Sequence, residues 1–242
     1  MGTRPNGNSL WLDSIKAHLL FFERPLAPVY PAWQGLRMLV AFVVVAVALF
    51  FALRHGLAGI RLFDGALRPT LFVAGLLLAF LLLQRAWLKL PFEHIGLRPW
   101  HDWTRRERLY LLQVVPLAAL AFALVFHAHL QALWQMHGTA GFLVFSLATG
   151  MAWGAVQELL YRGWLQTELT RRFGPWAGLL LANLAFTFGP LHLDYLTDPQ
   201  GPRWLGLLAI FGIGLLFGTI YRRSGNLWLP ALLHGLWPPN MG

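Results

Sequence analysis

Long apolar segments separated by short polar ones run through most of this chain. Counted along the sequence, they lie at about 34–53, 70–88, 109–127, 175–191, 204–220 and 226–237, and a further one starts near Gly141 and is expected to continue past the membrane as an amphipathic helix up to Phe173. Apolar runs of roughly 20 residues are typical of transmembrane helices, because a helix rises about 1.5 Å per residue. Backbone groups in lipid must be satisfied within the segment itself. The pattern therefore predicts an all-α, polytopic transmembrane helical bundle of about seven membrane helices.

The first part of the chain follows a different pattern. Within residues 9–24, four apolar residues share one helical face, namely Leu12, Ile15, Leu19 and Phe22. The charged residues Asp13, Lys16 and Glu23 lie on other faces. Such a segment is typical of a helix that lies in the membrane interface. We therefore divide the chain into an N-terminal polar segment with an interfacial helix, 1–33, and a single membrane domain, 34–242.

Composition and charge support a membrane protein. Hydrophobic residues make up 57% of the chain and charged residues 12%, whereas a soluble domain carries about 25% charged residues. The net charge of +9 is spread over short loops, which favours membrane orientation over nucleic-acid binding. The basic residues are concentrated in 85–108, 171–174 and 222–225, so we expect these loops and the N-terminus on the cytoplasmic side. The excess of arginine over lysine is compatible with a bacterium, and we expect its inner membrane.

One carboxylate, Glu158, lies inside a predicted membrane run, in the stretch Gln157-Glu158-Leu159-Leu160-Tyr161-Arg162-Gly163. A charge at membrane depth costs a few kcal/mol or more, so its presence is a functional hypothesis by default. Arg162 follows four residues later, on the same helical face, where an ion pair can form. The pair has two interpretations at this point: part of a functional site, or a structural lock between helices.

Two histidines reach a similar depth. Glu158 and His192 lie at nearly equal distances, about 25 Å, on either side of the break at Gly174-Pro175. His234 lies about 14 Å from the turn at Gly225, and all three agree in depth if 164–173 extends past the bilayer. Phe188 is expected to share a helical face with His192. Each histidine alone can instead be an interfacial or hydrogen-bonded structural residue.

A buried acid with two imidazoles suits water activation and proton transfer, and it equally suits part of a metal shell. The chain has no cysteine, no His-Glu-x-x-His zinc motif and no Gly-x-Ser-x-Gly elbow, which argues against thiol and serine hydrolases. A second histidine group, in a predicted loop, could bind metal but is more often solvated: His127, His129 and His137.

The order of these motifs resembles the CPBP intramembrane proteases, which include CAAX-prenyl-protease-like and bacteriocin-processing proteins. The family pattern is Glu-Glu-x-x-x-Arg-Gly, then Phe-x-x-x-His, then His-x-x-x-Asn. Here the first motif is the stretch from Gln157 to Gly163, the second runs from Phe188 to His192, and the third begins at His234. The resemblance covers a core at 141–240.

The resemblance implies roles for these positions. Position 157, as a glutamate, would be the general base and would activate water with His192. His234 would stabilise the oxyanion, with Glu158 and Arg162 supporting the site. Three further residues are expected to support it: Tyr161, Phe188 and Asn240.

Two departures from the family pattern matter. Gln157 stands where the family has the catalytic glutamate, and an amide cannot accept the proton. Pro238 stands where the family has asparagine, and Asn240 comes two residues late. Either a catalytic glutamate was deliberately replaced, or the chain is naturally degenerate. We favour replacement, since the rest of the first motif is intact.

The leading hypothesis is an intramembrane endopeptidase that is impaired by Gln157. Expected partners are membrane lipid and peptide substrates with a membrane-proximal cleavage site, such as C-terminal sorting tails or peptide precursors, and not nucleic acid. No cofactor is expected, with zinc or another divalent metal as the alternative. Two other functions stay open: a non-catalytic, immunity-type membrane binding protein, and a proton-coupled transporter, against which the lack of a visible inverted repeat counts.

Overall fold

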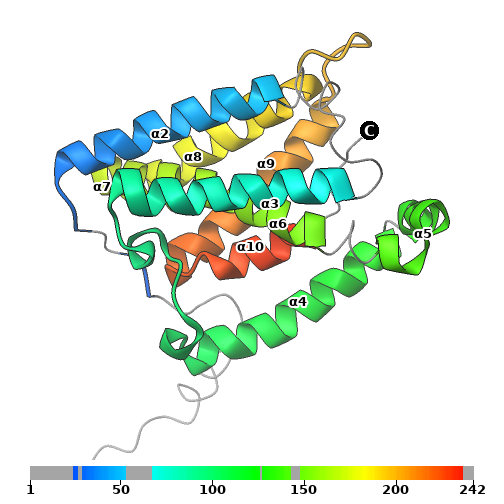
Figure 1. The fold of residues 1–242 in the computed structure, drawn as a ribbon, viewed down its shortest axis with the longest axis horizontal. Coiled ribbons are helices and arrows are strands. Elements are labelled where there is room, and N and C mark those ends of the chain that lie inside the picture. The colour runs from blue at the N-terminus through cyan, green and yellow to red at the C-terminus, as the bar shows by residue number, and fades with distance from the viewer. Residues whose placement is uncertain (1–23, 27–28, 53–66, 126, 143–147, 237–242) are drawn as a thin grey trace, which may run out of the picture.

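The protein is a bundle of helices (Figure 1). The computed structural model describes residues 24–26, 29–52, 67–125, 127–142 and 148–236, and every regular element among them is helical. The all-α fold class predicted from the apolar runs is therefore confirmed. Residues 9–23 of the predicted interfacial helix lie outside the described residues.

Four described helices are long and apolar enough to cross a membrane. These segments are Ala32–Phe51, Thr70–Leu88, Arg105–Leu124 and Trp204–Ser224. They correspond to α2 (Ala32–Phe51), α3 (Leu67–Leu82) with its π-helical continuation η2 (Leu83–Leu88), α4 (Arg105–Val125) and α9 (Trp204–Ser224). A shorter apolar helix, α8 (Pro175–Phe188), accompanies them. Many leucines and valines on their outer faces are exposed, as expected for surfaces in contact with lipid.

The predicted span at 226–237 is wrong as a membrane crossing. The helix there, α10 (Trp228–Gly235), has eight residues and is about 12 Å long, too short to span the hydrocarbon core. It is largely buried against α6 (Gly150–Glu158). The residues of this run are apolar because α10 is buried against other helices of the protein, and an apolar run alone does not distinguish that from a membrane crossing.

The predicted loop that carries the three histidines is also wrong, since it forms helix α5 (His127–Phe142), interrupted at Gly138 with φ 63°. Its residues between the histidines include alanine, leucine, glutamine and methionine, which favour helix over loop. His127 lies exposed in this helix, and its Nδ1 is 3.3 Å from the carbonyl of Leu124.

The segment that carries the first motif is the buried centre of the bundle. Helix α6 continues without a break through the π-helix η6 (Leu159–Gln166) into α7 (Thr167–Phe173), as the sequence predicted for the run up to Phe173. All eight residues of η6 are buried. Gly174, at φ 86°, then reverses the chain, and Pro175 starts α8, which packs along α7. Figure 1 shows α2, α3, α8 and α9 around this centre, with α4 set to one side.

Helices α6 and α10 cross at two glycines. A Cβ atom on Gly154 would lie 2.5 Å from the backbone nitrogen of Gly235, and a Cβ on Gly235 would lie 2.6 Å from Cα of Met151. Small residues allow helices to approach this closely. The crossing fixes α10, and with it His234, against the segment that carries Glu158.

A Gly154→Ala substitution is expected to destabilise the protein by about 1–3 kcal/mol, the usual cost of overpacking. Gly75→Ala is the matched control, because Gly75 is exposed in α3 and a Cβ there would meet nothing within 4 Å. That control should leave the melting temperature unchanged or raise it, since alanine favours helix by about 1 kcal/mol. Thermal unfolding of both variants in detergent measures the difference, and similar shifts would contradict a tight crossing.

The start of α2 is fastened to α7 by the buried carboxylate of Glu168. Tyr30 donates to it at 2.9 Å, Arg171 donates twice at 2.7 Å, and Arg172 donates from Nε. Burial of Glu168 opposes ionisation, but the hydrogen bonds from the two arginines and Tyr30 outweigh it and hold the pKa of this carboxyl below its usual value. The ionised form is therefore the one that the fold stabilises.

This depressed pKa predicts a loss of stability in acid. The contribution is present above the unfolded pKa of about 4.3 and is lost as the pH falls through the lower folded value. Glu168→Gln should lower the melting temperature at pH 7 and flatten its fall between about pH 5 and pH 3. Melting curves at a series of pH values test this, and an unchanged acid profile in the variant would rule the carboxylate out as the cause.

Candidate functional site

Glu158 is a fully buried carboxylate with two cationic or hydrogen-bonding neighbours. Nδ1 of His234 donates to its Oε1 at 2.8 Å, and Nη1 of Arg162 lies 3.2 Å from the same oxygen. Arg162 also donates from Nη2 to the carbonyl of Gly214 on α9 at 2.9 Å. The predicted ion pair between Glu158 and Arg162 is therefore present. It links the central helix to both α9 and α10.

His192 lies on a short 3-10 helix, η7 (Pro190–Tyr195), which follows α8. Its Nδ1 is 2.7 Å from the carbonyl oxygen of Phe186. Because a carbonyl only accepts, Nδ1 carries the proton in this hydrogen bond, and Nε2 of the neutral ring keeps its lone pair. This arrangement leaves Nε2 available as a base.

The two imidazoles meet at the ring of Phe186. The centroid of this ring lies 4.8 Å from that of His192 and 5.9 Å from that of His234, and Arg162 Cζ lies 4.4 Å above it. Three segments distant in the chain thus bring an acid and two imidazoles together, as the depth argument predicted. The sequence did not indicate Phe186, because its spacing of six residues from His192 fits no helical face.

Phe188, which was expected to share a helical face with His192, does not. Helix α8 ends at Phe188, because Gly189 is extended and Pro190 starts a new 3-10 helix. The Phe188 side chain is 43% exposed, while Phe186 contacts the histidines instead. The predicted helical run to residue 191 was therefore too long.

Several buried polar atoms around the first motif have no hydrogen-bond partner among the described residues. They include Gln157 Oε1, Glu158 Oε2, the Tyr161 hydroxyl and Thr187 Oγ1. A buried polar atom left unpaired costs about 1–3 kcal/mol, so such atoms in one region mark a site that favours water or a polar ligand. The π-helix η6 begins directly after Glu158, and π-helical turns are frequent at functional sites.

Tyr161 is held in this region by two aromatic rings. Its ring makes edge contacts with Phe42 of α2 and Phe186 of α8, with centroids 5.4 and 5.2 Å apart. A Cβ on Gly189, at the foot of the turn that carries His192, would lie 3.3 Å from the Tyr161 hydroxyl. Tyr161 therefore lies beside the turn of His192, which is compatible with its predicted supporting role.

Pro238 and Asn240 lie outside the described residues. Within the part of the chain that the structure describes, no three His, Asp or Glu side chains are grouped in a way that could hold a metal ion. The roles of the site residues and the choice between metal-free and metal-dependent chemistry stay predictions.

The fold and the site together define the class: an integral membrane protein of apolar helices with a buried acid–imidazole cluster. Residues 139–238 match the family described as type II CAAX prenyl endopeptidase Rce1-like. This part of the chain is similar to that family, which is of the CPBP type and is a family of proteases. The resemblance inferred from the three motifs is thereby confirmed, and all three motifs lie within the matched residues.

A curated relative, the uncharacterized protein YpbD of Bacillus subtilis (strain 168), is 33% identical to this chain over 78 residues. The matched part is 32% of this chain and 33% of YpbD, so the chain spans about a third of the length of that relative. No solved structure matches the chain.

Proposed function

We propose that this chain is an intramembrane endopeptidase whose activity is suppressed by glutamine at position 157. The observation that carries the proposal is that His192 and His234 meet at the ring of Phe186 while Glu158 is hydrogen-bonded to His234. Peptide hydrolysis needs a base to deprotonate water and donors to stabilise the oxyanion. Its family supports peptide or protein substrates in a membrane context.

The chemistry assigns a step to each residue. A glutamate at position 157, with Nε2 of His192, takes a proton as the water oxygen adds to the carbonyl carbon of the peptide bond. The C–N bond then breaks as that proton passes to the leaving nitrogen. His234, oriented by the carboxylate of Glu158, donates from Nε2 to the oxyanion when its ring is protonated. Arg162 holds the Glu158 carboxylate in place.

The amide of Gln157 cannot act as this base, because it has no basic carboxylate. The side chain is 4% exposed and its Oε1 is buried without a described partner, so the position itself is suited to a polar group that holds water. Sequencing the native gene at this codon decides between a replaced glutamate and a naturally degenerate chain.

We further propose a bacterial inner-membrane location with a cytoplasmic N-terminus, and substrates such as C-terminal sorting tails or peptide precursors. The basic segment at 85–108 supports this orientation. We propose metal-free catalysis, since a base and oxyanion donors suffice. Elemental analysis of the purified protein with zinc as the reference metal tests this, and stoichiometric metal would contradict it.

A second function is favoured by two residues of the sequence, Gln157 and Pro238. Both replace family residues that carry hydrolysis, so the chain can also be a non-catalytic protein that holds a partner peptide. One set of measurements on the full chain in liposomes separates the functions. Cleavage of a membrane-anchored peptide by a Gln157→Glu variant supports the protease, partner capture without cleavage by that variant supports the binder, and proton-coupled flux supports a transporter.

A further inference from the structure

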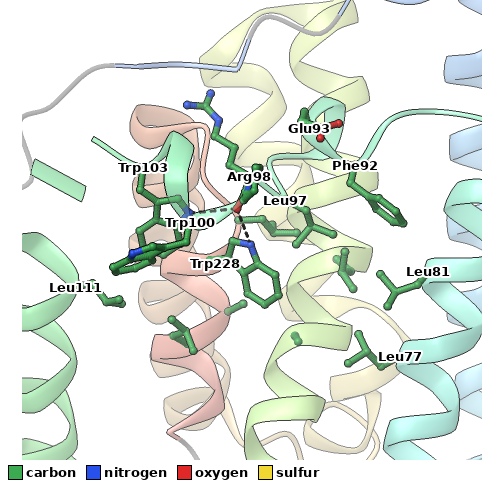
Figure 2. Close-up of a pocket in the computed structure, with 16 residues that line it drawn as sticks. Leu77, Leu81, Phe92, Glu93, Leu97, Arg98, Trp100, Trp103, Leu111 and Trp228 are labelled. Carbon is green, nitrogen blue, oxygen red and sulfur yellow. Dashed lines mark hydrogen bonds between the residues drawn. The ribbon is translucent and has the colours of Figure 1, made fainter. Parts of the chain in front are cut away.

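A large, mostly apolar pocket is lined by residues of several helices (Figure 2), and none of Glu158, His192 and His234 is among them. Its volume is about 640 Å³, within the range of ligand-binding pockets. Its walls come from several helices and include Leu77 and Leu81 of α3, Leu111 of α4, Ala155 of α6, Leu159 of η6 and Ala231 of α10. The pocket therefore spans the space between α3 and α4.

This pocket is not the access route to position 157. Ala155 and Leu159 are four residues apart and share the face of the central helix that lines the pocket. Gln157 lies two residues from each of them, about 200° around the helix.

The polar atoms at one end of the pocket are already paired with each other. The indole nitrogens of Trp103 and Trp228 both donate to the carbonyl oxygen of Arg98, each at 3.1 Å (Figure 2). Their rings are left to wall the pocket together with the leucines. Two charged residues, Glu93 and Arg98, also line the pocket, and Nη1 of Arg98 is buried without an acceptor among the described residues. The other lining residues are apolar or aromatic, so the cavity favours hydrocarbon over water, with a cation available for a polar headgroup.

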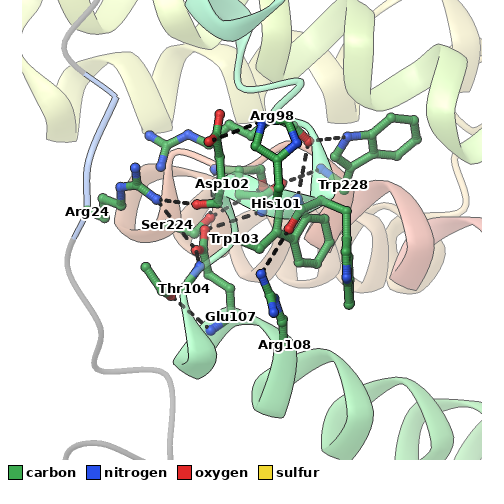
Figure 3. Close-up of polar contacts among 12 residues, drawn as sticks. Arg24, Arg98, His101, Asp102, Trp103, Thr104, Glu107, Arg108, Ser224 and Trp228 are labelled. Atoms are coloured by element: carbon green, nitrogen blue, oxygen red, sulfur yellow. Dashed lines mark hydrogen bonds and ion pairs between the residues drawn. The ribbon is translucent and has the colours of Figure 1, made fainter.

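The α4 wall of the pocket is fixed at its N-terminal end by polar contacts (Figure 3). Thr104 and Glu107 form a capping box, in which the Thr104 nitrogen donates to Glu107 Oε2 at 2.7 Å and the Glu107 nitrogen donates to Thr104 Oγ1 at 3.2 Å. Asn226, in the turn before α10, donates to Glu107 Oε1 at 3.2 Å. The pocket is therefore bounded by anchored helices at this end.

The same end carries an aromatic and basic rim. Trp100, 55% exposed, lines the pocket, and the guanidinium of Arg108 lies 5.2 Å from its ring centroid. Arg108 donates from Nη2 to the Trp100 carbonyl at 3.2 Å, while its Nε is buried with no acceptor among the described residues. Tryptophan and basic residues in this arrangement are typical of the headgroup zone, where they attract anionic lipid.

We propose that the pocket binds one acyl chain of an anionic phospholipid, whose phosphate lies against Arg108. Hydrocarbon fills the leucine-lined space between α3 and α4, and the guanidinium supplies a charge-assisted hydrogen bond to the phosphate. The inference does not depend on peptidase activity, because it rests on a different face of the central helix.

The experiment uses the full chain, purified in detergent and stripped of lipid, and native mass spectrometry. Phosphatidylglycerol and phosphatidylcholine with the same acyl chains are added separately. We expect one phosphatidylglycerol to stay bound and phosphatidylcholine to be retained roughly tenfold less, because the choline cation of phosphatidylcholine cancels the negative headgroup charge that attracts Arg108. Equal retention of the two lipids would overturn the proposal.

Neighbouring residues of α3 supply the matched pair of variants. Leu77→Trp, which fills the pocket, should reduce bound phosphatidylglycerol at least tenfold, whereas Leu78→Trp, on an exposed position, should not. Leu81→Trp is the second pocket-filling variant, and melting curves confirm that each variant is folded. Arg108→Gln should remove the preference for phosphatidylglycerol, and Arg106→Gln should keep it. Unchanged lipid binding in folded Leu77→Trp and Leu81→Trp variants would show that the lipid lies elsewhere.

Discussion

A Gln157→Glu variant reconstituted in liposomes is expected to cleave a membrane-anchored peptide tail at least 100-fold faster than the chain with Gln157. A positioned general base contributes about 10²–10⁴-fold to the rate of such a reaction, and the amide contributes none of it. Adding His192→Ala to the glutamate variant should return cleavage to the background, because Nε2 of His192 is the second proton acceptor in the proposed step. Release of a fluorescent tail fragment measures all three rates.

Gln113→Glu serves as the control for the added charge, since Gln113 is exposed on α4 and far in sequence from the motifs. It should leave the cleavage rate at the level of the unmodified chain. If the Gln157→Glu protein is folded and cleaves no faster than the Gln113→Glu protein with any tail offered, the peptidase proposal fails. Equal cleavage with and without the His192 imidazole would equally remove His192 from the mechanism.

Replacing Arg162 by methionine is expected to destabilise the protein by about 3–5 kcal/mol, among the largest effects of any single change. Arg162 is 1% exposed and Glu158 is fully buried, so the substitution leaves a carboxylate inside the bundle whose remaining hydrogen-bond partner, among the residues that the structure describes, is His234. The substitution also removes the hydrogen bond from Arg162 to the Gly214 carbonyl, which connects α9 to the central helix. Thermal or chemical unfolding in detergent measures the change.

A double variant separates the charge from the volume of the side chain. Glu158→Gln together with Arg162→Met removes both charges and should be more stable than Arg162→Met alone, because no unpaired carboxylate remains. Arg106→Met, at an exposed position of α4, should shift stability by no more than about 0.5 kcal/mol. A double variant less stable than Arg162→Met alone would show that the ion pair is not the source of the effect.

Local regularities account for most of what the sequence predicted correctly. The apolar runs identified the helices at Ala32–Phe51, Thr70–Leu88, Arg105–Leu124 and Trp204–Ser224, because span length depends on a fixed rise per residue. The four-residue spacing of Glu158 and Arg162 predicted their ion pair for the same reason. Two predictions failed. The polar residues at the three histidines were interpreted as a loop, although they form helix α5, and the apolar run at α10 was interpreted as a membrane crossing.

Position along the helices was enough to predict that Glu158, His192 and His234 reach a common depth. It was not enough to show which groups touch, since the end of α8 at Phe188 turns the chain and makes Phe186 the ring between the two histidines.

By itself, then, the sequence determined the membrane class, the order of the three motifs and the missing base at position 157, because each is a property of residue type and spacing. Only the tertiary structure decided that His234 pairs with Glu158, that Phe188 faces outward and that a separate apolar pocket lies behind the site. These features depend on how helices distant in the chain pack sideways against each other, and no local spacing encodes that.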